Sequence, residues 1–109
     1  MKKHLPEFNK KYHLRFDGVE YDIIYNEDGT VQSTCTAADL NHHPSRINQL
    51  KTFKVNRFEI EDNIWCVYWN TAKVSMVYIE DFNKMIVNAI LTMPDMTQVR
   101  ETGTITETE

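Results

Sequence analysis

The sequence predicts an all-β protein, an eight-stranded antiparallel up-and-down barrel with one short helical segment near residues 45–50. Short runs rich in β-branched and aromatic residues recur at regular spacing, which is typical of an antiparallel meander. Turn-forming residues such as Asp17-Gly18 separate these runs. Only three glycines and three prolines occur, and nearly all lie in the expected turns, so the strand interiors are little interrupted.

The predicted elements follow one another with short connections. The first strand stops at Asp17-Gly18, a pair that tolerates the positive φ of a tight hairpin, and the second stops at another hairpin signal, residues 27–29. The alternating pattern fails between residues 37 and 50, where Ser45 is a possible helix N-cap. The eight predicted strands cover residues 12–16, 19–25, 30–36, 52–61, 64–69, 73–80, 84–93 and 97–107.

Composition predicts one domain, residues 1–109, because 41% hydrophobic residues suffice for one compact core. The net charge of -4 is spread along the chain without a run of five like charges, so we expect no nucleic-acid partner. No apolar run follows the N-terminal lysines or approaches the roughly 20 residues of a membrane span, so we expect no membrane partner. A cytoplasmic protein is expected, with Cys35 and Cys66 as buried thiols.

Several segments resemble a known family. The run F-D-G-V-E-Y-D-I-I-Y-N-E-D-G-T (16–30), then V-Y-W (67–69) leading into V-S-M-V-Y (74–78), is similar to the calycin-type barrels of phenolic acid decarboxylases. The run Y-I-E-D-F-N-K-M-I-V-N-A-I-L-T-M-P-D (78–95) and the closing G-T-I-T (103–106) resemble more closely the MoaF-type (molybdenum cofactor biosynthesis protein F-like) lipocalin-like domain. The similarity covers roughly residues 12–106 and implies a small barrel that can hold a ligand.

The enzymatic part of this resemblance does not carry over. The decarboxylases place two tyrosines on the first strand, an arginine near the crossover and a glutamate after a later strand. The matching positions here are Leu14, Phe16, a place near Arg46 or Asn48, and Thr71. Decarboxylation needs hydroxyl donors for the carboxylate and a carboxyl group for the phenolic proton. Leu14, Phe16 and Thr71 cannot supply them, so this chemistry is disfavoured.

No other catalytic residue, metal site or cofactor is predicted. The adjacent pair His42-His43 lacks a second ligand pair, and Cys35, between threonines, is typical of a small core residue. Arg46 is kept as a candidate because it falls where the mouth of a barrel would lie and can meet an anionic head group. The carboxylates at positions 59, 61, 80 and 81 are expected to be solvated, the usual state of such groups.

Alternation with period two assigns the barrel interior. It places residues 12, 14 and 16 on one face of the first strand and residues 19, 21, 23 and 25 on one face of the second. The family resemblance implies that Trp69, Val74 and Met93 point inward, and alternation then adds residues 65, 67, 76, 78, 87, 89 and 91. The predicted ligand-binding residues are Phe16, Tyr21, Arg46, Trp65, Trp69, Met76, Tyr78 and Leu91.

The opposite side of strands 64–90 is unusually apolar for a solvent-facing surface. Its predicted residues are Ile64, Cys66, Tyr68, Ser75, Val77, Ile79, Ile86, Asn88 and Ile90. A contiguous apolar patch of this size needs cover, and a second copy of the chain is the favoured partner over intramolecular cover.

Three functions remain open. The favoured one is a small-molecule-binding, lipocalin-like barrel for an apolar or aromatic ligand, which would enter at the end bounded by residues 37–50. The alternatives are an enzyme of the decarboxylase-like superfamily with an unrecognised reaction, and a filled barrel that acts in protein–protein interaction. The volume left between the inward side chains decides between an open and a filled barrel.

Overall fold

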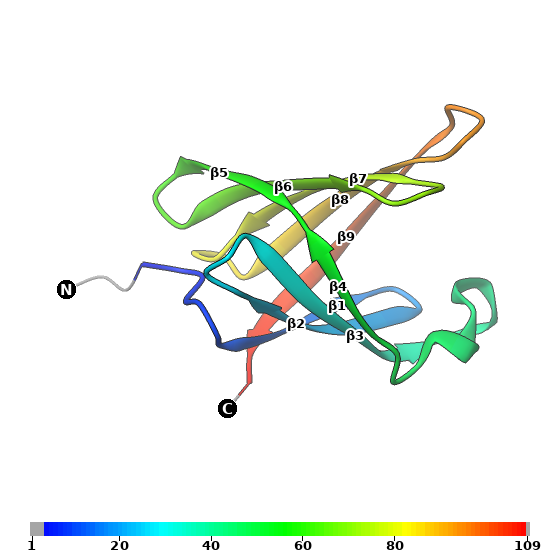
Figure 1. Cartoon of the computed structure of the whole chain (residues 1–109), viewed down its shortest axis with the longest axis horizontal. Coiled ribbons are helices and arrows are strands. Elements are labelled where there is room, and N and C mark those ends of the chain that lie inside the picture. Colours follow the sequence, from blue (N-terminus) through cyan, green and yellow to red (C-terminus); the bar gives the residue numbers. More distant parts are fainter. Residues whose placement is uncertain (1–3, 109) are drawn as a thin grey trace.

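The computed structural model describes residues 4–108 and consists of one curled, nine-stranded antiparallel sheet (Figure 1). The strands are β1 (Lys11–Phe16), β2 (Val19–Tyr25), β3 (Thr30–Ala38), β4 (Leu50–Lys54), β5 (Asn56–Glu61), β6 (Ile64–Asn70), β7 (Ser75–Asp81), β8 (Ile86–Thr92) and β9 (Gln98–Glu107). Their order in the sheet is β4-β3-β2-β1-β9-β8-β7-β6-β5. The predicted all-β antiparallel class is confirmed.

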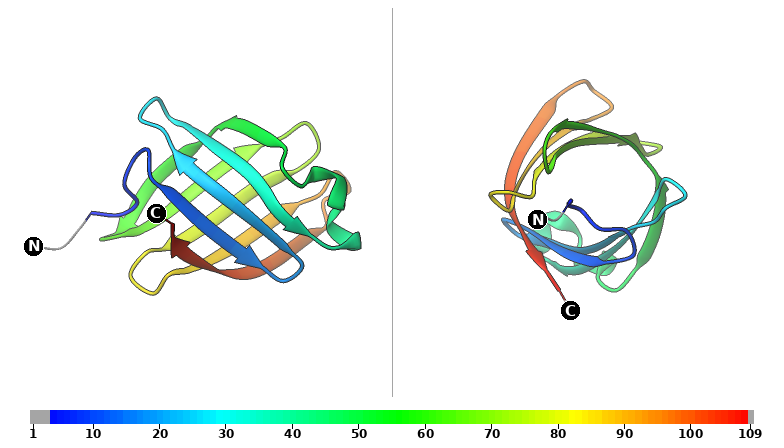
Figure 2. Two further views of the ribbon diagram at one scale, coloured as in Figure 1. Left: turned by 90° about the horizontal axis from the view of Figure 1, so that it is seen from below. Right: turned by 90° about the vertical axis from the view of Figure 1, so that its left-hand side faces the viewer.

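The two edge strands of the sheet, β4 and β5, are consecutive in the chain. Only Val55 separates them, and its side chain is buried while its N–H donates to the carbonyl oxygen of Gly29 at 3.1 Å. The single strand predicted for residues 52–61 is therefore two strands on opposite edges. The sheet curls around a central space, as the end-on view shows (Figure 2).

The predicted turns at residues 17–18 and 27–29 form as hairpins. Phe16 pairs with Val19 across the first turn, and Gly18 has φ 83°. Asp17 does not share this positive φ, so only one residue of the pair uses the conformation that motivated the prediction. A Cβ at Gly18 would lie 2.4 Å from Oδ2 of Asp39, so glycine is also required by the close approach of the crossover segment.

The crossover between β3 and β4 contains two short 3₁₀ turns, η1 (Leu40–His42) and η2 (Pro44–Arg46), rather than a helix near 45–50. His43 has φ 61° between them, which interrupts any continuous helical hydrogen bonding. Asp39 caps the first turn by accepting from the main-chain N–H groups of Asn41 and His42. The predicted N-cap, Ser45, instead lies inside η2.

Residues 4–10 cross the end of the barrel that lies opposite the 40–46 turns (Figure 1). The N–H of Leu5 donates to Oδ1 of Asn63 at 2.8 Å, and the indole N–H of Trp65 donates to the carbonyl oxygen of Leu5 at 2.8 Å. Pro6 is buried, and the rings of Tyr12 and Phe82 pack edge to face at 5.3 Å. These contacts close this end of the barrel.

The two cysteines, Cys35 and Cys66, are both buried and both free, as predicted. Burial raises the pKa of the Cys66 thiol. Within residues 4–108, the structure has no helix of the length and apolar character that a membrane-crossing helix requires.

Candidate functional site

The barrel interior contains a cavity of about 650 Å³. It is lined by Leu14, Tyr21, Ile23, Tyr25, Val31, Ser33, Cys35, His43, Arg46, Gln49, Lys51, Phe53, Val67, Trp69, Thr71, Ala72, Lys73, Val74, Met76, Tyr78 and Glu80. The exposed members of this set lie in residues 43–51 and in the β6–β7 turn at 71–74. The cavity therefore opens between these two segments, which we call the mouth.

The paired residues of β6 and β7 show how far each side chain lies from the mouth. Trp69 pairs with Met76 next to the β6–β7 turn, and Val67 pairs with Tyr78 one row further in. The ring of Trp69 lies 4.9 Å from that of Tyr78, edge to face, so aromatic surface lines the middle of the cavity. The indole Nε1 of Trp69 is buried and has no hydrogen-bond partner among the described residues.

Glu80 occupies the inner end of the cavity and is fully buried. The hydroxyl of Tyr25 donates a hydrogen bond to its Oε1, whereas Oε2 has no partner within residues 4–108. Burial raises the pKa of Glu80 to about 7, although the Tyr25 hydrogen bond and the nearby Arg57 charge both oppose this rise. The expectation that Glu80 is a solvated charge is wrong.

Arg57 pairs with Val67, one row nearer the mouth than Glu80, and its guanidinium reaches aromatic rings of the closed end. Its guanidinium carbon lies 4.2 Å from the ring centre of Trp65 and 4.8 Å from that of Tyr25, within cation–π range of both rings. The Arg57 charge therefore acts on Glu80 from a position that aromatic rings hold in place.

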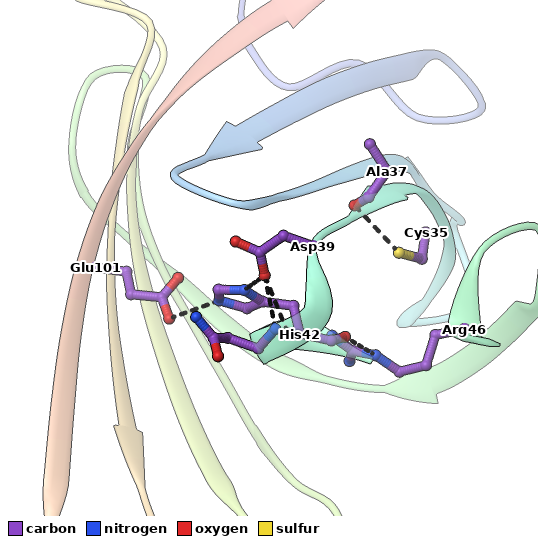
Figure 3. A network of polar contacts seen from close by, with 7 residues as sticks. Cys35, Ala37, Asp39, His42, Arg46 and Glu101 are labelled. Carbon is purple, nitrogen blue, oxygen red and sulfur yellow. Dashed lines mark hydrogen bonds and ion pairs between the residues drawn. The ribbon is translucent and has the colours of Figure 1, made fainter. Parts of the chain in front are cut away.

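A polar network fixes the crossover segment at the mouth (Figure 3). The ring of His42 contacts Oδ1 of Asp39 through Nδ1 at 2.7 Å, and its Nε2 lies 3.9 Å from Oε1 of Glu101 on β9. The guanidinium of Arg46 donates to the main-chain oxygen of His42 through Nε at 3.0 Å and through Nη2 at 2.7 Å. These contacts hold Arg46 beside the cavity.

Arg46 also affects Tyr21, which lies on the cavity wall. Burial raises the pKa of the Tyr21 hydroxyl, and the charge and hydrogen bonding of Arg46 partly offset that rise. Arg46, Lys51 and Lys73 are the arginine and lysine residues of the lining, whereas the carboxyl group of Glu80 lies at the far end. The mouth therefore favours an anionic group.

Five of the eight predicted ligand-binding residues line this cavity: Tyr21, Arg46, Trp69, Met76 and Tyr78. Phe16 packs behind the wall, with its ring 5.9 Å from that of Tyr78. Trp65 points toward the closed end, under Arg57, and Leu91 packs against the core. The structure thus gathers five of these residues around one space and places the other three outside its lining.

The sequence reasoning missed Glu80 as a cavity residue, together with Lys51 and Lys73 at the mouth. The signal for Glu80 was present, since Met76 and Tyr78 were assigned inward and alternation along β7 gives Glu80 the same side. The lysines lie at strand ends and in a turn, where alternation gives no information about depth.

One group of side chains could offer metal ligands. His4, Glu59 and Asp62 bring one ligand atom each within 4.8 Å of one another, and all three residues are exposed. The His4 ring nitrogens lie 3.6 Å from the Glu59 carboxylate and 4.0 Å from the Asp62 carboxylate, which ordinary surface ion pairs explain. This group lies away from the cavity lining.

Comparison with known proteins places this barrel in a family. A family model described as MoaF-like matches residues 8–106. The chain belongs to the MoaF-like family. The resemblance drawn from residues 78–95 and 103–106 is therefore confirmed. A search of curated protein sequences finds no match to this MoaF-like chain.

The fold of this MoaF-like protein is similar to a solved structure. That structure is the crystal structure of a putative beta-lactamase from Burkholderia vietnamiensis, with a TM-score of 0.79. The alignment covers 98% of this chain and 100% of the other, at 17% sequence identity. Similarity at this identity supports the shared fold alone.

Proposed function

We propose that this MoaF-like barrel binds a small apolar or aromatic molecule that carries an anionic group. The observation that carries the proposal is the cavity of about 650 Å³, a volume within the range of small-molecule sites. A filled barrel would leave no such space between its inward side chains, so the cavity favours ligand binding over the alternative of a filled barrel that acts in protein–protein interaction.

The chemistry of the lining supports the orientation of the ligand. Aromatic and aliphatic side chains from β2, β6 and β7 form the walls and suit an apolar body. Arg46, Lys51 and Lys73 surround the mouth and suit an anionic head group. The ligand therefore enters between residues 43–51 and 71–74 with its anionic end outermost.

An enzymatic function has weaker support. The decarboxylase positions carry Leu14, Phe16 and Thr71, which have no suitable acid or carboxylate-orienting group. The similar solved structure is titled a putative beta-lactamase, yet no serine of this chain has a lysine three residues later, the spacing of the serine enzymes of that class. Binding without a reaction is the simpler function for this cavity.

The test is a titration with 2-naphthoate and flavin mononucleotide, followed by tryptophan fluorescence and by the melting temperature. The matched variants Trp65→Phe and Trp69→Phe each leave one tryptophan. The ligand should change the emission of Trp69, which lines the cavity, far more than that of Trp65, which lies under Arg57 at the closed end. The absence of any change in emission or melting temperature at millimolar ligand refutes the proposal.

The outer face of β6–β8 supports a second proposal, homodimerisation. Tyr68, Val77 and Ile90 form one outward row across these strands, next to the row of Cys66, Ile79 and Asn88. The larger exposed apolar residues of this face and of the adjoining strand β5 are Phe58, Ile60, Tyr68 and Ile90, with 53%, 49%, 42% and 39% of their surface accessible.

The exposed part of this face differs in position from the predicted patch. Cys66 is buried and Ile79 and Ile86 are half-buried, whereas the most exposed apolar side chains, Phe58 and Ile60, belong to β5. A second copy of the chain is the proposed cover, because a two-fold contact places like apolar surfaces together. Like the cytoplasmic location, the dimer stays a prediction.

A further inference from the structure

Two polar atoms of the cavity lining lack partners, and they differ in character. The indole Nε1 of Trp69 is a donor, and Oε2 of the Glu80 carboxyl group is an oxygen that can accept; both are buried and unpaired among the described residues. Buried polar groups in proteins are almost always hydrogen-bonded, so each such group calls for an explanation. Both residues line the cavity, so a ligand held there is the candidate partner of both atoms.

The positions of these atoms give the ligand a direction. Trp69 on β6 lies next to the mouth and pairs with Met76 on β7. Glu80 lies four residues further along β7 than Met76. Four residues of strand span about 13 Å. An elongated ligand that reaches both side chains therefore places an acceptor near Trp69 and a donor near Glu80.

Charge decides which kind of donor fits at the inner end. The charge of Arg57 already acts on Glu80, and its guanidinium lies against the rings of Trp65 and Tyr25. An ammonium group would have to pass Arg46, Lys51 and Lys73 at the mouth and then add a second cation beside Arg57. A neutral hydroxyl or N–H group meets neither obstacle.

We propose that Glu80 is the inner ligand-recognition residue of the cavity and selects elongated aromatic anions with a neutral hydroxyl or N–H group at the end remote from the anion. Tyr25 holds the carboxyl group in place through Oε1, which leaves Oε2 for the ligand. This inference rests on the proposed function, because it assigns the inner end of the same cavity.

Three probes of matching shape test the inference: 6-hydroxy-2-naphthoate, 6-methoxy-2-naphthoate and 2-naphthoate. The methoxy compound keeps the ring oxygen and removes only its proton. Hydrogen bonds to a charged carboxylate are among the stronger ones, so at pH 8, above the raised pKa of Glu80, the hydroxyl probe should bind the unaltered protein at least about tenfold more tightly than the methoxy probe. Dissociation constants are measured by isothermal titration calorimetry.

Glu80→Gln should reduce this preference to within about twofold, because the amide can present N–H groups where the carboxyl oxygen accepted. Glu61→Gln, the same change at an exposed position of β5, should leave the preference intact. Tyr25→Phe should also keep it, since this variant removes the neighbouring hydroxyl but not the carboxyl group. Loss of the preference in Tyr25→Phe, with its retention in Glu80→Gln, overturns the assignment.

The outcomes separate this inference from the proposed function. Equal binding of all three probes by the unaltered protein overturns the role of Glu80 and leaves the binding function standing. Failure of every probe to bind removes both. The comparison between hydroxy and methoxy probes is made in the unaltered protein, so it can overturn the role of Glu80 even if Glu80→Gln does not fold.

Discussion

Replacing Glu80 with glutamine should change how the stability of the protein depends on pH. The pKa of this buried carboxyl group is raised from 4.5 to about 7 by burial. Between these pH values the folded state binds more protons than the unfolded chain, so the free energy of unfolding falls as pH rises. The stabilisation is complete below pH 4.5 and is lost as pH rises through about 7.

The size of the effect follows from the same two pKa values. A pKa that moves from 4.5 to about 7 corresponds to roughly 3 kcal/mol of stability lost across this window. The tyrosines that interact with Glu80 do not titrate there, because burial raises the pKa of both Tyr25 and Tyr78. Glutamine has no proton to exchange, so this part of the pH dependence disappears in Glu80→Gln.

The assay is urea unfolding at half-unit steps from pH 4.5 to 8, with circular dichroism as the readout. The stability of the unaltered protein relative to Glu80→Gln should fall by roughly 3 kcal/mol between pH 4.5 and 7.5. Glu61→Gln, with an exposed carboxyl group on β5, should not change this slope. Parallel curves for the unaltered protein and Glu80→Gln would show that the carboxyl group is not buried as described.

Three further outcomes are expected. Gly103→Ala should destabilise the fold by about 1–3 kcal/mol in urea unfolding, because a Cβ there would lie 2.5 Å from the main-chain oxygen of Arg15; an unchanged midpoint contradicts this packing. Burial opposes protonation of His13, but its hydrogen bonds to two carboxylates, of Asp22 and Glu20, outweigh this effect and raise its pKa. Measured relative to His13→Gln, the free energy of unfolding should therefore fall by under about 1 kcal/mol as pH rises from 6.5 through the raised pKa. If His13→Gln shows the same dependence of stability on pH as the unaltered protein, His13 does not contribute to it. The double variant Val77→Lys, Ile90→Glu, at paired positions of the outer face, should sediment as a folded monomer while the parent sediments as a dimer, and a parent that is monomeric at high micromolar concentration argues against the dimer.

The fold was predictable because its signals are local. Period-two alternation and the Asp17-Gly18 pair define the first hairpin within a few residues, and the observed pairing of Phe16 with Val19 follows from them. The split at Val55 was not predictable in this way. It arises where the chain passes from one edge of the curled sheet, β4, to the other edge, β5, and nothing in the run 52–61 marks that step.

The candidate site was predictable only in part, for two different reasons. Alternation correctly predicted that Trp65 faces inward, but alternation does not tell how far along the barrel axis a side chain lies. The N-terminal segment covers Trp65 at the closed end. Glu80 lies on the same side of β7 as Tyr78, yet its acidic side chain led to the prediction that it is exposed to solvent. Its stabilising partner Tyr25 is 55 residues away in sequence, a distance over which alternation carries no information.

The measurement that tests the central claim most directly is a two-dimensional ¹H–¹⁵N spectrum of the tryptophan indole groups during ligand titration. The chain has two tryptophans: the N–H of Trp65 donates to Leu5, whereas that of Trp69 is unpaired in the cavity lining. Addition of 6-hydroxy-2-naphthoate should shift the Trp69 signal to saturation and leave the Trp65 signal nearly unchanged, with Trp69→Phe providing the assignment. A Trp69 signal that stays fixed for the naphthoates and for flavin mononucleotide at millimolar concentration would contradict the account of an open, ligand-binding barrel.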